Sequence, residues 1–288
     1  MRRRRNQPGV RDAGALSGLG TALDRVRYEV LPLPSVLEQT ATLPERSVVT
    51  VTASPTKDLD ATVEVCEKLA AQRLCAVPHL AARQVRDTAH LRDLLDRLDG
   101  AEIDEVFVVG GDAEAPGGFR DGLALLRAME ELGRLPARVG VPSYPEGHPT
   151  IPGDRLWQAL RDKQAYADYT VTQLCFDAAA VCAFVDRARA HGITLPVVAG
   201  VPGMVDRAKL LTVGARIGVG DSLRFLRHNR SLVRGLIGRR GHQPETLLAD
   251  LASRRADGAC AVSGLHFYTF NRVGATARWV TTARERGT

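Results

Sequence analysis

The stretch GLHFYTFNR, residues 264–272, decides the fold. Its aromatic residues, its β-branched Thr269 and its apolar flanks predict a β-strand. A His lies near the start of this strand, and a Tyr, an Asn and an Arg lie at or just past its carboxyl end. In a barrel of alternating strands and helices, the carboxyl ends of the strands carry the chemistry. We therefore interpret this stretch as the last strand of such a barrel.

The same alternation runs through the chain in front of this stretch. Short apolar runs recur at roughly thirty-residue spacing, with amphipathic segments between them. Strands are predicted over Arg27–Leu33, Ser47–Ser54, Leu74–Ala81, Glu105–Gly110, Arg138–Ser143, Tyr169–Phe176, Leu195–Val201 and Ala261–Phe270. Helices are predicted over Leu59–Ala71, Thr88–Leu98, Arg120–Leu132, Arg155–Tyr166, Ala178–Ala190, Val205–Ala215 and Pro244–Arg255.

Eight strands alternating with helices predict a (β/α)8 barrel, the TIM-barrel class of α/β folds. The rival is an open doubly wound sheet, which usually carries a Gly-rich phosphate turn after its first strand. Here the first strand ends in Leu33-Pro34-Ser35, without such a turn. The interval Gly218–Gln243 predicts one or two extra helices before the last strand. We expect a basic tail over residues 1–24 and a single barrel domain over residues 25–288.

Composition limits the class of protein. The chain has 288 residues, of which 44% are hydrophobic, and this suits a globular domain with a sizeable core. The sequence contains no run of about 18 apolar residues, so no membrane helix is predicted. No apolar segment follows the basic start, so we expect a cytoplasmic protein rather than a secreted one. The Arg-rich start also resembles an organelle transit peptide, an alternative to a loose tail.

The net charge of +6 raises the question of nucleic-acid binding. Residues 1–27 hold seven Arg and two Asp, a net charge of +5, which leaves +1 for the rest of the chain. A nucleic-acid-binding face would instead show Lys and Arg clustered within folded elements. We therefore expect no nucleic-acid partner, and keep binding through the Arg tail as a minor hypothesis. The oligomeric state stays open, a homo-oligomer included.

The five cysteines predict neither a disulfide framework nor a metal site. Their number is odd and no two are spaced as C-x-x-C. Several lie in apolar segments, where Cys behaves as a small buried hydrophobe. We expect reduced thiols and no bound metal.

Polar residues at strand ends are the candidates for chemistry. Glu29 lies between Tyr28 and Val30, and a carboxylate among apolar residues is costly to bury in its ionised form. This predicts a general acid, or alternatively a Glu that pairs with a Lys or Arg inside the barrel. Gln173, inside another apolar strand, needs hydrogen-bond partners, which are either neighbouring backbone or a planar heterocycle.

Other strand ends are polar or Gly-rich. Thr52 and His79 belong to the second and third strands, and Gly110-Gly111-Asp112 follows the fourth, where glycines let a backbone approach a ligand. The fifth strand leads into a Pro-rich loop that contains Tyr144, Glu146 and His148. The convergence of these strand ends predicts a binding site.

These stretches, taken in order, resemble the methylenetetrahydrofolate reductase family. YEVLPL at 28–33 is similar to its FEFFPP strand, and VPHL at 77–80 to its APHL. GGD at 110–112 matches the last two letters of its RGD. YPEGHP at 144–149 fits its YPExHP, and TQLCFD at 172–177 resembles its TQFFFD. The stretch 265–272, LHFYTFNR, is nearly the family's HFYTLNR. The order of the blocks on successive strands is specific.

The resemblance implies a barrel enzyme of one-carbon metabolism and methionine biosynthesis. Such an enzyme reduces 5,10-methylenetetrahydrofolate to 5-methyltetrahydrofolate with NADH or NADPH, in most members through bound FAD. The resemblance gives Glu29 the role of protonating N10 of the folate, and Asp112 that of stabilising the developing cation. It implies folate contacts for Gln173, Tyr268 and Arg272, and cofactor contacts for Thr52, His79, Gly111, Asp112, Tyr144, His148 and Lys163. His266 is expected to be structural, near the base of its strand.

The sequence departs from the family where the flavin is bound. Gly110 replaces the usual Arg, and on the helix before the sixth strand only a basic residue such as Lys163 matches. Direct hydride transfer from the nicotinamide, without flavin, is therefore an alternative. The turn after the seventh strand also differs, and this keeps open a folate-dependent methyl-transfer or demethylation enzyme.

Overall fold

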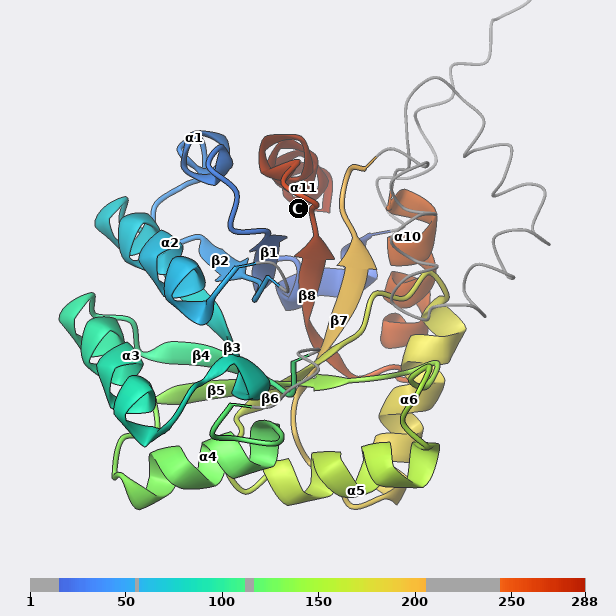
Figure 1. The fold of residues 1–288 in the computed structure, drawn as a ribbon. Coiled ribbons are helices and arrows are strands. Elements are labelled where there is room, and N and C mark those ends of the chain that lie inside the picture. Colours follow the sequence, from blue (N-terminus) through green and yellow to red (C-terminus); the bar gives the residue numbers. More distant parts are fainter. Residues whose placement is uncertain (1–15, 55–56, 112–116, 206–243, 288) are drawn as a thin grey trace, which may run out of the picture.

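The barrel predicted from the sequence is confirmed. A computed structural model of the chain describes residues 16–54, 57–111, 117–205 and 244–287. Its strands are parallel, each pairs with the next in chain order, and β8 pairs with β1 to close the barrel (Figure 1). The strands are β1 (Val26–Val30), β2 (Val48–Val51), β3 (Cys75–Ala81), β4 (Glu105–Val109), β5 (Arg138–Ser143), β6 (Tyr169–Thr172), β7 (Val197–Pro202) and β8 (Val262–Tyr268).

Helices lie outside the strands (Figure 1). Several begin at an aspartate whose carboxylate accepts a hydrogen bond from a backbone N–H of the first turn, which stabilises the helix start. Asp58 does this for α2, Asp87 for α3, Asp121 for α4 and Asp177 for α6. The helices are α1 (Val36–Thr40), α2 (Leu59–Ala71), α3 (Thr88–Gly100), α4 (Gly122–Glu131), α5 (Gly153–Lys163), α6 (Ala178–Ala190), α10 (Glu245–Ala256) and α11 (Val273–Gly287).

Two predicted helices, α2 and α6, are confirmed to the residue. The sequence did not predict the short α1 or the terminal α11. Beyond Val205, the predicted helix Val205–Ala215 lies outside the described residues, and so does the predicted insertion over Gly218–Gln243.

Successive residues of a strand face opposite sides of the barrel wall. Tyr28 and Val30 of β1 belong to the large core between strands and helices. Val77, Phe107 and other strand residues form a separate apolar cluster inside the barrel. Because Glu29 lies between Tyr28 and Val30, it belongs to the interior face of β1.

A buried ion pair closes the amino end of the barrel interior. The Arg27 guanidinium lies 2.6 Å from the Glu105 carboxylate and 4.3 Å from the centre of the Tyr169 ring. The Tyr169 hydroxyl donates to the same carboxylate at 2.7 Å. Glu105 and Tyr169 are the first residues of β4 and β6, so this network forms the floor of the barrel.

The contacts of the barrel begin in front of residue 25, the expected start of the domain. A 3-10 helix, η1 (Ser17–Ala22), packs against α10. Leu19 and Ala22 are fully buried there. Gly18 passes so close to the backbone of Ala252 that a Cβ atom at this position would collide with the Ala252 carbonyl. Residues 16–24 are therefore part of the packed structure.

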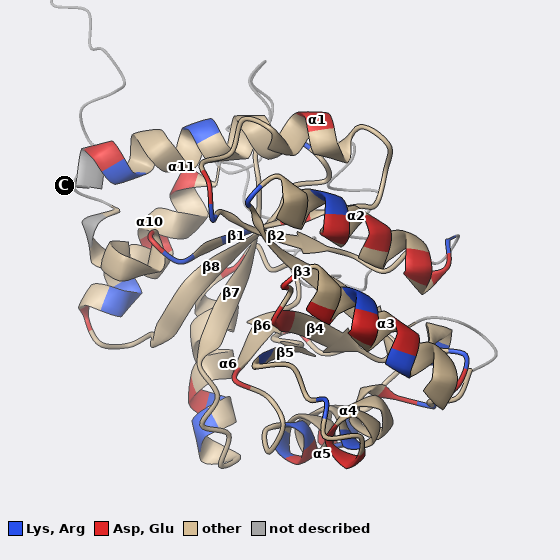
Figure 2. Cartoon of the chain, turned by 90° about the vertical axis from the view of Figure 1, so that its left-hand side faces the viewer, with Lys and Arg blue, Asp and Glu red and all other residues tan. Residues whose placement is uncertain are grey.

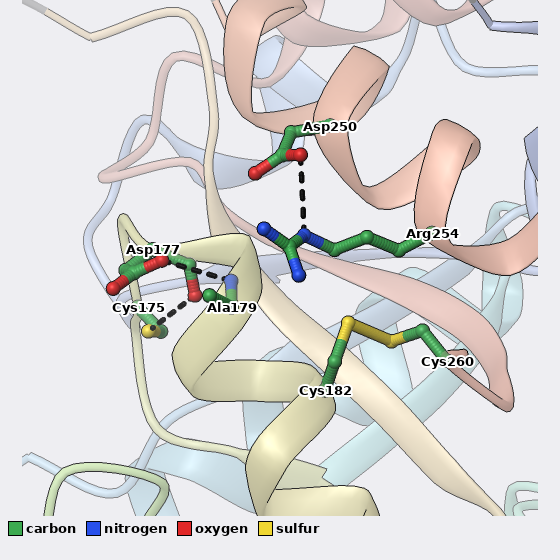
Figure 3. The surroundings of a disulfide bond; sticks show 7 residues. All are labelled: Cys175, Asp177, Ala179, Cys182, Asp250, Arg254 and Cys260. Carbon is green, nitrogen blue, oxygen red and sulfur yellow. Dashed lines mark hydrogen bonds and ion pairs between the residues drawn. A yellow bond between two sulfur atoms is a disulfide. The ribbon is translucent and has the colours of Figure 1, made fainter.

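The expectation of reduced thiols is wrong for two cysteines. Cys182 of α6 forms a disulfide with Cys260, which lies just before β8 (Figure 3). Their Cα atoms are 4.9 Å apart and 78 residues separate them in the chain. The sequence offered no signal for this pair, because the partners come together only through the packing of α6 beside β7 and β8. Cys66, Cys75 and Cys175 form no disulfide within the described residues.

Charged residues of both signs are distributed along α2 and α3 (Figure 2). Asp60 pairs with Arg86 and Arg97, and Glu67 also pairs with Arg97. These ion pairs join the two helices. Within the described ranges, no helix combines the length and apolar character of a membrane span. The same ranges hold no group of three or more His, Cys, Asp or Glu side chains suited to a metal ion.

Candidate functional site

The predicted site residues gather at the carboxyl ends of the strands. The strand register places Glu29 of β1 beside Thr50 of β2 on one side and Tyr268 of β8 on the other. His79 lies near the end of β3. The remaining predicted residues of this rim directly follow a strand or lie two residues past its end: Thr52, Gly111, Tyr144 and Gln173.

The Glu29 carboxylate is the centre of this group. Its Oε2 atom lies 3.0 Å from Nε2 of His266 and 3.9 Å from Nε2 of His79. The Glu29 side chain is only 16% exposed, and the two imidazoles are more deeply buried still. The alternative of a Glu paired with a Lys or Arg is not what the described residues show, because Arg27, the nearest cation on β1, pairs with Glu105.

His266 was expected to be structural, near the base of β8, and this is wrong in the respect that matters. Its ring reaches the carboxylate of the candidate acid. The signal was available in the sequence: His266 and Tyr268 are two residues apart on one strand and therefore share a face. Tyr268 was predicted to face the site, so His266 had to face it too.

His79 is a neutral imidazole near neutral pH. Burial lowers its pKa from 6.5 to about 4, against the opposing effect of the Glu29 charge. Its ring packs on Phe107 at 4.6 Å between ring centres. His79 therefore presents Glu29 with a dipole and not with a positive charge.

Tyr268 stays a phenol throughout the accessible pH range. Burial and the charge of Glu29 raise its pKa well above the usual value of 10.0. Its hydroxyl donates to the carbonyl of Thr172 at 3.1 Å, which links β8 to β6 across β7. Gly200 of β7 makes this possible, because a Cβ atom there would lie 2.8 Å from the Tyr268 ring.

Four buried polar atoms around Glu29 lack a hydrogen-bond partner within the described residues. In native proteins such atoms are uncommon, and each one needs a physical explanation. Their concentration on the interior faces of neighbouring strands makes this end of the barrel the candidate site for a polar ligand. The atoms are Oγ1 of Thr50, Oγ1 of Thr52, Nε2 of His79 and Nδ1 of His266.

Gln173 is half-buried at the end of β6, and its amide is partly engaged. Its side-chain carbonyl accepts a hydrogen bond from the backbone N–H of Leu174 at 2.8 Å. Its own backbone N–H donates to the carbonyl of Ser143 at 2.7 Å. Of the two hypotheses for this residue, backbone contact is thus observed for the oxygen, and the amide nitrogen is the group that can donate to a ligand.

Asn271 is a residue of the site wall whose role the sequence did not reveal. Its side-chain oxygen accepts from the backbone N–H of Leu31 at 2.7 Å, and its amide nitrogen donates to the Leu31 carbonyl at 3.1 Å. Phe270 and Asn271 both have positive φ, 48° and 63°. This paired contact fixes the turn after β8 against the chain that leaves β1 just beyond Glu29.

Other predicted residues lie further out or outside the described ranges. Tyr144 and His148 contact each other edge to face, with ring centres 5.1 Å apart. Arg272 is exposed just beyond β8. Lys163, at the end of α5, is half-buried, and burial lowers its pKa while the nearby Asp121 opposes this. Asp112 lies outside the described residues, and Gly111 before it has a φ of +86°.

Known proteins match a large part of the barrel sequence. A family profile described as "Methylenetetrahydrofolate reductase" matches residues 33–219. "Methylenetetrahydrofolate reductase 1" of Schizosaccharomyces pombe is 28% identical over 168 residues, which make up 55% of this chain and 26% of that protein. The chain therefore spans well under half the length of that relative.

Two solved structures match most of the chain at low similarity. One comes from Burkholderia cenocepacia J2315 and is provisionally assigned as a lyase/mutase. It is 16% identical, with a TM-score of 0.47 over 95% of this chain and 86% of its own. The other is a chitinase from Rhizomucor miehei, 10% identical, with a TM-score of 0.45 over 90% of this chain and 100% of its own. These likenesses are too weak to bear on function.

Proposed function

The chain belongs to the methylenetetrahydrofolate reductase family, and from that premise we propose that it reduces 5,10-methylenetetrahydrofolate to 5-methyltetrahydrofolate with NADH or NADPH. The observation that carries this proposal is the half-buried Glu29 carboxylate at the barrel mouth, held by His266 and surrounded by unpartnered polar atoms. A cytoplasmic enzyme of one-carbon metabolism that supplies methyl groups for methionine is the corresponding cellular role.

Glu29 is the general acid of this proposal. The five-membered ring of the substrate must open to an iminium before hydride arrives, and this requires a proton at N10. A carboxylic acid within a mostly apolar wall can hold and deliver that proton. Glu29 has the burial this role needs, and its described neighbours leave Oε1 without a hydrogen bond of its own.

Tyr268, Gln173 and Arg272 are the proposed folate contacts. Tyr268 and Gln173 flank Glu29 on the same rim, and the Gln173 amide nitrogen can donate to a pterin acceptor. Arg272, exposed at the rim, suits the carboxylates of a folate tail. Asp112 keeps its proposed role of stabilising the cationic iminium.

The family is generally flavin-dependent, and we propose FAD as the cofactor. The residues at the mouth fit such a group in part: Thr52 and His79 carry unpartnered buried polar atoms. The space beside Gly110 is open, since a Cβ atom there would meet nothing within 4 Å. FAD, when bound, would carry hydride from the nicotinamide to the folate. Gly111, Tyr144, His148 and Lys163 are its other proposed contacts.

Direct hydride transfer from the nicotinamide is the second candidate, and one observation favours it. Lys163, proposed as a phosphate contact, is half-buried, and burial lowers its pKa, so its charged form is less favoured than that of an exposed lysine. Loss of that contact would weaken the hold on the flavin diphosphate but leave the acid Glu29 in place. A folate-dependent methyl-transfer enzyme on the same barrel is a third candidate.

Activity and absorbance together test these candidates. Purified protein is expected to oxidise NADH or NADPH only when 5,10-methylenetetrahydrofolate is present, and to form 5-methyltetrahydrofolate. Flavin absorbance in the purified protein would support FAD, whereas a colourless active protein would establish direct transfer. Methyl transfer to tetrahydrofolate without nicotinamide oxidation would replace the proposed reaction.

Replacing the acid tests its role. Glu29→Gln should lower kcat by at least about a hundredfold, because a general acid contributes roughly that much or more. The control is Glu64→Gln, which removes an exposed carboxylate of α2 that pairs only with its neighbour Lys68. Full activity of Glu29→Gln would remove Glu29 from the mechanism.

A further inference from the structure

His266 is a buried titratable group that the proposed reaction does not use. We infer that it is the positioning residue of Glu29: its Nε2–H donates a hydrogen bond to Oε2 of Glu29 and so leaves Oε1 to hold the acidic proton. This inference rests on the proposed function for the role of that proton. The contact between His266 and Glu29 is observed directly, since Nε2 of His266 and Oε2 of Glu29 are 3.0 Å apart.

The strand register brings this pair together. Arg27 of β1 is the partner of His266 in β8, and Glu29 is the partner of Tyr268. Glu29 and His266 are therefore diagonal neighbours on two adjacent strands, close enough for a long side chain to reach across. The Tyr268 ring packs against the imidazole at 4.9 Å between ring centres and limits its rotation.

The tautomer follows from the two nitrogens of the ring. The His266 side chain is 1% exposed, and its Nδ1 is buried without a partner in the described part of the chain. A proton on Nδ1 would therefore be a buried donor without an acceptor, which costs more than a bare lone pair. With the proton on Nε2, the N–H meets the carboxylate and only the lone pair of Nδ1 is unsatisfied.

The groups that face the pair do not compete for this contact. His79 approaches from β3 and is neutral near pH 7. Tyr268 remains protonated and donates to Thr172. Arg27, two residues before Glu29, is engaged by Glu105, and Tyr144 lies beyond them near Tyr268. Thr50 and Thr52 face the pair from β2 without charge.

The consequence is a fixed position for the acidic proton. When Oε2 accepts from His266, the proton of the carboxylic acid resides on Oε1. Transfer breaks the O–H bond at Oε1 and forms an N–H bond at N10 of the folate, which gains the positive charge. Glu29 is left as a carboxylate that still accepts from His266, and His266 keeps its proton throughout.

The pH profile of kcat distinguishes this role from a purely structural one. His266→Phe keeps a ring but removes the donor, so the carboxylate loses a charge-assisted hydrogen bond and Glu29 becomes a weaker acid. We expect the alkaline fall in activity to move up by about one to two pH units, with a lower kcat on the plateau. His266→Gln can place an amide N–H near the lost Nε2 and should restore the wild-type profile.

A matched control is His90→Gln in α3. His90 is a similarly buried imidazole that lies 3.2 Å from a carboxylate, that of Asp60, but it belongs to an outer helix and not to the barrel interior. This variant should lower stability and leave the pH profile unchanged. If His266→Phe is folded, as judged by circular dichroism, and its alkaline limb does not move, the inference is overturned.

Nitrogen-15 NMR of labelled protein tests the tautomer independently of any activity. In wild type, His266 should show a protonated Nε2 and a bare Nδ1 near neutral pH, and the Nε2 signal should shift in Glu29→Gln. A proton on Nδ1, or on both nitrogens, would contradict the inference. Correct NMR signals without reductase activity would instead refute the proposed function and leave the pair intact.

Discussion

At the scale of single residues, the site contains one imidazole, that of His79, whose uncharged form is favoured by burial. His79 is packed against Phe107 and is almost fully buried, so water stabilises its protonated form poorly. Burial outweighs the attraction of Glu29 and brings the pKa to about 4. The residue therefore titrates at a lower pH in the folded protein than in the unfolded chain.

This difference predicts a loss of stability in mild acid. The folded pKa of His79 is below the unfolded value of 6.5, so its contribution is present above pH 6.5 and lost as pH falls toward 4. The full loss is about 3 kcal/mol of the free energy of unfolding. Urea denaturation at pH 7, 6, 5 and 4 should show it, and His79→Gln should flatten the dependence. An equally steep curve for His79→Gln would assign the effect to other groups.

The sequence allowed those site residues to be predicted that lie at the ends of strands. Glu29, His79 and Tyr268 lie where a barrel built from this sequence must place them. The role of Asn271 could not be predicted, because its contacts with Leu31 join segments 240 residues apart. Such contacts depend on how the barrel closes, which no local pattern specifies.

At the scale of elements, helices were predicted more accurately than strand ends. An aspartate cap defines the start of α2 and of α6, and a stripe of buried apolar residues runs along each helix. The sixth strand was predicted as Tyr169–Phe176, but β6 ends at Thr172. Residues 174–176 are buried although they belong to a loop, so their apolar sequence resembles that of a strand. A run of apolar residues indicates that a segment is buried, but it does not show that the segment pairs with a neighbouring strand.

The disulfide between α6 and the start of β8 should stabilise the closing side of the barrel. It links Cys182 and Cys260, which are 78 residues apart, and a disulfide typically stabilises a protein by about 2–4 kcal/mol. The double variant Cys182→Ser/Cys260→Ser should therefore unfold at lower temperature. Dithiothreitol should lower the melting temperature of the wild type and leave that of the double variant unchanged. Equal sensitivity of both proteins would mean that the bond does not contribute.

At the scale of the whole molecule, the interior of the barrel is divided between its two ends. The carboxyl end holds Glu29 and a cluster of four polar atoms that lack a partner within the described residues. At the amino end the Tyr169 hydroxyl donates to the Glu105 carboxylate, and Arg27 Nη1 forms an ion pair with it at 2.6 Å, although without hydrogen-bond geometry. We expect residues at the carboxyl end to affect catalysis, because their polar groups can bind a ligand. We expect the paired residues at the amino end to affect the free energy of unfolding. The two ends should therefore respond differently to mutation.

Glu105→Leu tests this division. It leaves the Arg27 charge buried without a carboxylate, and breaking a buried pair in this way costs about 3–5 kcal/mol. The double variant Arg27→Met/Glu105→Leu removes both charges and should regain most of that loss, as guanidinium chloride denaturation would show. The folded fraction of Glu105→Leu should keep the wild-type kcat, since Glu105 lies at the opposite end of the barrel from Glu29. If kcat falls while the protein remains folded, the floor takes part in the chemistry and the two ends are not independent.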